Sequence, residues 1–78
     1  MPTILRIGSY RFFFYSNEGT EPPHIHVQKD TCLAKFWLNP IELAKSLRFS
    51  ATELNQLRKH ITEHEQYLLE KWNEYFHH

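Results

Sequence analysis

The sequence predicts an α+β domain, in which one long C-terminal helix packs on one face of a small, mostly antiparallel sheet of four or five strands. Three observations support this fold class. Short apolar and aromatic runs alternate with turn residues through the first half of the 78-residue chain. A helix-capping signal opens the second half. Beyond it, apolar residues recur every three or four positions, with no glycine or proline between them.

Turn residues set the limits of the predicted strands. Gly8 and Ser9 form a two-residue turn signal, which predicts a hairpin between the first two strands. The segment over about 41–46 follows an Asn-Pro pair and consists of good helix formers, but its alternation favours an edge strand. The other strands are expected over about 3–7, 10–15, 24–29 and 32–38.

The second half predicts a single helix over about 51–76. Ser50 and Glu53 have the spacing of a capping box, which marks the start of the helix. We expect His64, which falls on the apolar stripe, to be partly buried and hydrogen-bonded to the backbone. The rest of that stripe consists of Leu54, Leu57, Ile61, Leu68, Trp72 and Tyr75.

The length of this helix predicts a contact with another polypeptide. About 25 residues at 1.5 Å each span roughly 38 Å, whereas a strand of about six residues spans some 20 Å. The helix should therefore extend past the sheet, and its apolar end would need cover from a second copy or a small partner protein. The residues expected at this contact are Leu69, Trp72, Tyr75 and Phe76.

Composition limits the class of protein. Residues 1–78 suffice for one domain, and the 41% hydrophobic and 23% charged residues are typical of a folded globular chain. A formal net charge of zero argues against a protein that binds nucleic acid through an overall positive charge. A local basic face is still compatible with a neutral chain. One cysteine, Cys32, excludes an internal disulfide framework. Without a signal peptide or a membrane span in the sequence, we expect a cytoplasmic protein with no membrane contact and no cofactor.

The most informative motif is the run PPHIHV at 22–27. Side chains along a strand alternate between the two faces, so His24 and His26 should share one face while Ile25 and Val27 share the other. Neighbouring strands extend this alternation, and both imidazoles are then expected in solvent, away from the helix. The predicted outer face consists of Arg11, Phe13, Tyr15, His24, His26, Lys35 and Trp37.

Five motifs occur together and in order along the chain. They are MPTI at 1–4, YRFFFYS at 10–16, EPPHIHV at 21–27, AKFWL at 34–38 and WNEYF at 72–76. With these motifs the chain resembles the bacterial domain-of-unknown-function family 4160 over essentially its whole length. That family consists of small standalone bacterial proteins, often encoded beside another small uncharacterised protein, and this arrangement has prompted suggestions of toxin–antitoxin pairs. The resemblance implies an intracellular location and a partner, and it implies no established activity.

The outer face is open to three interpretations, of which the first is a binding surface. Phe13, Tyr15 and Trp37 are side chains that stack on bases, and Arg11 and Lys35 are cations that contact phosphates. Trp, Tyr and Arg are also enriched where proteins bind proteins, so this face is equally a candidate protein interface.

The second and third interpretations concern the histidines. His24 and His26 have the chemistry of a general acid–base pair, which would make a metal-independent ribonuclease with Arg11 or Lys35 at the phosphate. Two imidazoles at this spacing are also candidate ligands of a metal such as zinc, but a complete metal site needs further ligands. The helical histidines, one of which is His60, should lie on the opposite side of the sheet.

We interpret the sequence as a protein-interaction module of a two-gene, toxin–antitoxin-like system. Its expected partner is a second copy or a small protein from a neighbouring gene. The alternative is a histidine-dependent protein that binds or cleaves RNA.

Overall fold

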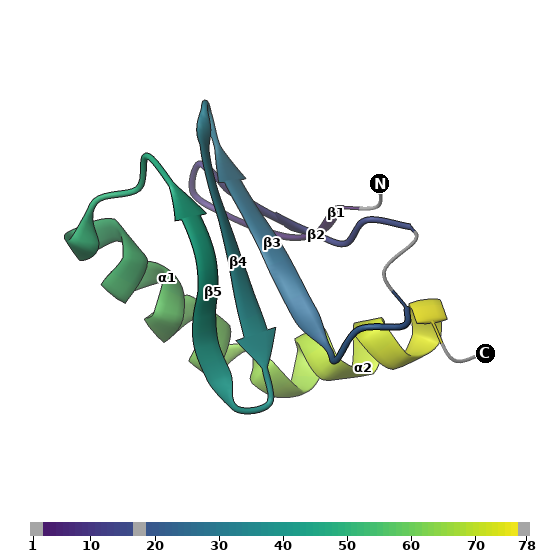
Figure 1. The fold of residues 1–78 in the computed structure, drawn as a ribbon. Coiled ribbons are helices and arrows are strands. Elements are labelled where there is room, and N and C mark those ends of the chain that lie inside the picture. The colour runs from purple at the N-terminus through teal and green to yellow at the C-terminus, as the bar shows by residue number, and fades with distance from the viewer. Residues whose placement is uncertain (1–2, 17–18, 77–78) are drawn as a thin grey trace.

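The computed structural model describes residues 3–16 and 19–76, which form one sheet with two helices packed on the same side of it (Figure 1). In chain order the elements are β1 (Thr3–Ile7), β2 (Tyr10–Phe13), β3 (His24–Lys29), β4 (Cys32–Leu38), β5 (Ile41–Leu47), α1 (Ala51–Glu63) and α2 (Glu65–Phe76).

The antiparallel sheet is confirmed, and it has five strands. Its order is β1-β2-β3-β4-β5, so each strand pairs with its neighbours in sequence and β1 and β5 are the edges. Gly8 and Asp30 have positive φ angles in their two-residue turns, as tight hairpins require. The β4–β5 turn contains a cis Asn39–Pro40 peptide. Strand β2 ends at Phe13, two residues earlier than predicted.

The prediction of one long C-terminal helix is wrong, because the helix is interrupted at His64. Nδ1 of that imidazole lies 2.9 Å from the carbonyl oxygen of His60, which also accepts the His64 backbone N–H at 3.1 Å. Two residues earlier, the Thr62 hydroxyl donates to the Arg58 carbonyl at 2.8 Å. Side chains that compete for carbonyls one turn back bend or break a helix. His64 is half-buried and bonded to the backbone, as predicted.

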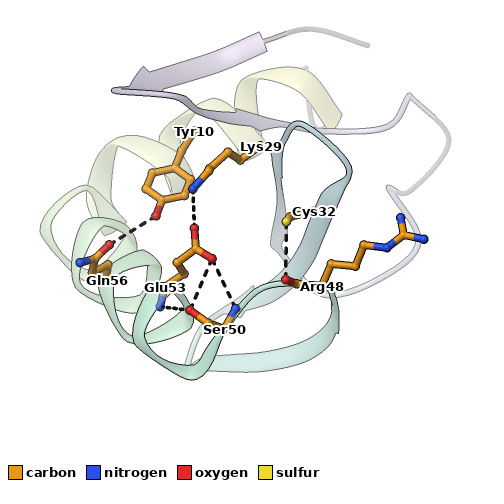
Figure 2. A network of polar contacts seen from close by, with 7 residues as sticks. All are labelled: Tyr10, Lys29, Cys32, Arg48, Ser50, Glu53 and Gln56. Atoms are coloured by element: carbon orange, nitrogen blue, oxygen red, sulfur yellow. Dashed lines mark hydrogen bonds and ion pairs between the residues drawn. The ribbon is translucent and has the colours of Figure 1, made fainter.

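A polar network fixes the start of α1 against the sheet (Figure 2). Ser50 caps the helix by accepting the Glu53 backbone N–H at 3.1 Å, and the capping box is complete. From β3, Lys29 donates to the Glu53 carboxylate at 2.5 Å. This hydrogen bond lowers the pKa of Glu53 and raises the pKa of Lys29 relative to their ordinary values. From β2, the Tyr10 hydroxyl donates to Gln56 at 3.3 Å.

The core lies between the inner face of the sheet and the helices. Register shifts occur at Thr3–Leu5 in the β1–β2 pairing and at Lys35–Phe36 in the β4–β5 pairing, where Ala44 of β5 is the extra residue. The pairing of β3 with β4 has none, so the alternation predicted for β3 holds. The helices contribute the apolar residues that their spacing predicted. The fully buried core includes Phe12, Phe14, Ile25, Val27, Phe36, Leu38, Leu57, Ile61 and Leu68.

The end of α2 extends beyond the strand ends, and the chain itself covers it. Trp72 is only 1% exposed, because the Phe14 ring packs edge-on against it at 5.3 Å and the Phe76 ring lies 4.2 Å away. The connection from β2 to β3 passes beside the helix end (Figure 1), and a Cβ on Gly19 would come within 2.9 Å of the Phe76 ring. Within the chain Trp72 is therefore covered, whereas Leu69, Tyr75 and Phe76 of the same predicted contact stay half-buried.

Among the described residues, neither helix combines the length and the apolar content needed to cross a membrane.

Candidate binding face on the outer side of the sheet

The sheet face opposite the helices carries the residues that the sequence singled out. Strand pairing aligns Phe13 with His26, His26 with Lys35, and His24 with Trp37. Directly opposed residues point to the same face, so these side chains form rows across β2, β3 and β4. We call this side the outer face.

His24 is not exposed to solvent, which corrects the prediction for this residue. Its side chain is fully buried, with ring centroids 5.0 Å from His26, 5.6 Å from Trp37 and 4.9 Å from Trp72. His24 is the first residue of β3, and α2 passes beyond the strand ends, which brings Trp72 against it. Alternation along the strand predicts a face, but it cannot predict that a helix closes over one end of that face.

The orientation of the His24 ring follows from its backbone partner. Its Nδ1 lies 2.9 Å from the Pro22 carbonyl oxygen, which can only accept, so Nδ1–H is the donor. The Glu21 carboxylate lies 4.0 Å from the same nitrogen. The double proline and His24 thus hold each other in place at the entry to β3.

His26 lies in the middle of the outer face and is half-buried. It stacks on Phe13 with ring centroids 5.5 Å apart, and Tyr15 approaches its ring edge-on at 4.6 Å. Phe13 itself is only 2% exposed, because the Arg11 guanidinium also covers its ring at 4.5 Å. Phe13 therefore lies beneath the surface that strand alternation predicted it to form, and Tyr15 and His26 form that surface in its place.

A groove of about 350 Å³ crosses the outer face from the end of β2 to β5. The β5 wall of this groove does not follow from strand alternation. Simple alternation from the β4–β5 turn would place Lys45 opposite Ala34 on the inner face, but the register shift places it opposite Lys35 on the outer face. The lining residues are Phe13, Tyr15, His26, Leu33, Ala34, Lys35, Lys45, Ser46 and Leu47.

The outer face is locally basic although the chain is neutral. Two pairs of cations face each other directly across strands, Arg6 with Arg11 and Lys35 with Lys45. Lys35 also contacts the Glu21 carboxylate at 2.7 Å. The helical segment 51–76 has the opposite balance, with five glutamates against three basic residues.

Of His24 and His26, only His26 is accessible to solvent. Burial of His24 keeps a substrate from its imidazole, and a general acid–base pair needs both groups within hydrogen-bond reach of the substrate. Within residues 3–16 and 19–76, no three histidine, cysteine or acidic side chains are grouped to hold a metal ion. His60 packs against Tyr10 at 6.1 Å, well away from the outer face.

The comparison with protein families gives a match. The model of the Domain of unknown function (DUF4160) matches residues 9–73. The chain belongs to this family. The DUF4160 match includes the whole of three recognised motifs, at 10–16, 21–27 and 34–38, whereas the MPTI motif lies outside it. Neither the curated proteins nor the solved structures compared with the chain gave a match.

Proposed function

We propose that this DUF4160 protein is an intracellular interaction module that binds a small partner protein through the outer face of its sheet. The groove on that face carries the proposal. It combines half-buried rings, Tyr15 and His26, with an apolar wall and two lysines. Aromatic side chains are enriched at protein interfaces, and lysines beside them provide charge complementarity to a partner of opposite charge. The expected partner is the product of a neighbouring gene, in a toxin–antitoxin-like pair. The family resemblance supports this choice.

The distribution of exposed apolar side chains supports the same surface. Of the four large apolar residues that are clearly exposed among those described, Leu33 and Leu47 lie opposite each other on the outer face and line the groove, whereas Leu43 lies opposite the inner-face residue Phe36. Exposed apolar side chains that cluster beside a groove mark interaction sites more often than scattered ones do. Tyr67 on α2 is the fourth.

A second candidate is binding of single-stranded RNA without cleavage, and the paired cations of the outer face favour it. Phosphate neutralisation by Lys and Arg supplies most non-specific nucleic-acid affinity. Base stacking, which supplies much of the rest, needs open aromatic faces. Phe13 is buried and Trp37 has the Lys35 ammonium over its ring at 4.6 Å, so the outer face offers few such faces. The protein partner is therefore the better supported candidate.

The test is co-expression of the tagged chain with the product of the adjacent gene, followed by co-purification. We expect the two proteins to elute together, and Leu47→Asp in the groove to weaken their association by about tenfold or more. Gln66→Asp, at an exposed position of α2, is the matched control and should leave binding unchanged.

Two outcomes contradict the proposal. If both variants bind the partner as the parent does, the partner uses another surface. If the adjacent gene product does not bind at all while a uridine oligonucleotide binds with a strong salt dependence, the RNA candidate replaces the protein partner.

A further inference from the structure

We propose that the partner docks as an added strand along β5, and that its paired segment carries acidic side chains toward Lys45. This inference rests on the proposed function and specifies the chemistry of the partner. It starts from the sheet order, in which β5 has a neighbour on one side only.

The two edges of the sheet differ in how far they are open. Three of the five residues of β1 are half-buried, and the Ile4 carbonyl accepts a hydrogen bond from the Tyr67 hydroxyl at 3.3 Å. Six of the seven residues of β5 are exposed. The Ile41 carbonyl at its start accepts from Arg58 at 3.1 Å, so the edge is closed there and open further along. Exposed edges of this kind accept strands from other chains.

Backbone pairing identifies which β5 groups face the open side. The Leu38 N–H donates to the Pro23 carbonyl, so the backbone N–H and C=O of Leu38 point toward β3. Backbone groups alternate between the two sides of a strand, so those of Ala34, four residues earlier, also point toward β3. Ser46 lies opposite Ala34, and its N–H and C=O therefore point away from β4. Ser46 therefore offers an added strand an outward backbone N–H and C=O, between the side chains of Lys45 and Leu47.

Charge selects the kind of strand that fits. Lys45 lies directly opposite Lys35, and like charges in this position repel. Lys35 has the Glu21 carboxylate at 2.7 Å, whereas no carboxylate among the described residues contacts Lys45. An acidic side chain on the added strand, beside Lys45, would lie at cross-strand distance and remove this repulsion. Leu47, half exposed, provides the adjoining apolar contact.

A second copy of the chain is a poorer occupant of this edge. Pairing through β5 would bring another Lys35 and another Lys45 to the same sheet face, and Glu42 is the one acidic residue that β5 offers in return. Charge complementarity therefore favours a different, acidic chain over self-association.

The test uses the full chain and two synthetic peptides, one alternating valine with glutamate and one alternating valine with lysine. We expect the valine–glutamate peptide to bind about tenfold more tightly, measured by fluorescence anisotropy, and to slow hydrogen exchange at the Ser46 amide. Lys45→Glu should reverse the preference between the two peptides. Lys59→Glu, at an exposed position of α1, should not change it.

Ser46→Pro removes the outward N–H of the edge and should abolish peptide binding while the β4–β5 ladder persists. Lys45→Glu and hydrogen exchange on the unchanged chain remain decisive if the proline variant does not fold. Equal binding of both peptides, or no protection at Ser46, overturns the added strand. If the adjacent gene product still binds in that case, and Leu47→Asp weakens its binding, the proposed function stands and only the strand pairing fails. Binding of a uridine oligonucleotide that needs Lys45 but tolerates Ser46→Pro also overturns the added strand.

Discussion

The inner and outer faces of the sheet belong to the same strands but have different chemistry. On the inner face, Val27 and Phe36 are completely buried against the helices. On the outer face, His26 and Lys35 lie on the same two strands and are half-buried beside a groove. Apolar burial is the main source of folding free energy, so the inner face holds the fold together and leaves the outer side chains available for binding.

The two faces meet at one end of the molecule. Trp72 of α2 packs against Phe14, which belongs to the core, and also against His24, which belongs to the outer row. The division between a structural face and a binding face therefore holds along β3 except at its first residue. The predictions below test that division, beginning with the place where it ends.

The largest expected effect is that of Trp72→Ala. Removal of an indole that is 1% exposed leaves a cavity between the core and the outer row, and we expect a loss of about 4 kcal/mol in unfolding free energy. Urea denaturation measures this loss. Gln66→Ala, at an exposed position of the same helix, is the control and should cost less than about 1 kcal/mol. Similar losses in the two variants would show that the end of α2 is not part of the core.

The second prediction compares the two imidazoles. His24→Ala removes a buried ring and its hydrogen bond to Pro22, and we expect a loss of about 2 kcal/mol in unfolding free energy. His26→Ala removes a half-buried ring, and the loss should be about half as large. Partner binding should weaken more in His26→Ala than in His24→Ala, because His26 lines the groove. If the parent cleaves RNA and a His24 variant of parental stability does not, the catalytic interpretation is restored.

Much of the inner face could be predicted from sequence, because its positions follow local patterns. Alternation placed Ile25 and Val27 in the core, and helical spacing placed Leu57 and Ile61 against them. The capping box at Ser50 is also a local signal. Each of these depends on residues a few positions apart, which is the range that periodicity describes.

The outer face could be predicted only in part, since its exceptions come from non-local geometry. Lys45 reaches the groove because of a register shift, which a one-dimensional pattern does not contain. Trp72 closes over His24 because α2 outruns the strands, and nothing in the PPHIHV motif signals that contact. The break at His64 depends on a side chain that bonds the preceding turn. Helical periodicity is the same on both sides of it.

A smaller effect is expected from pH, at the network that joins β3 to α1. The hydrogen bond from Lys29 lowers the pKa of Glu53 below its ordinary value of 4.5. Its contribution to stability is therefore complete above pH 4.5 and is lost as the pH falls through the lowered pKa. For Lys29, whose pKa is raised above 10.5, the contribution is lost as the pH rises through the raised pKa. Because the pair lies near the surface, both losses should be modest.

Thermal unfolding across these two pH ranges measures the contribution of the pair. Glu53→Gln keeps the shape of the side chain and removes its charge, so the variant should lose less stability in acid than the parent does. Glu70→Gln, at an exposed position of α2, is the control and should keep the parental profile. Identical acid profiles for Glu53→Gln and the parent would show that the ion pair adds nothing to stability.

The smallest expected effect has the opposite sign. Lys45→Glu replaces a like-charged cross-strand pair with an opposite-charged one, so the protein should become more stable, by about 0.5 kcal/mol. Lys59→Glu, on α1, offers a matched charge reversal away from Lys35 and should not stabilise the fold. Urea denaturation at low salt compares them, and added salt should shrink the difference. A gain in stability joined to a loss of partner binding would mean that the outer face keeps its opposed lysines for binding at the expense of folding free energy. No gain would mean that solvent already screens the two ammonium groups, and the acidic partner would then have no repulsion to relieve.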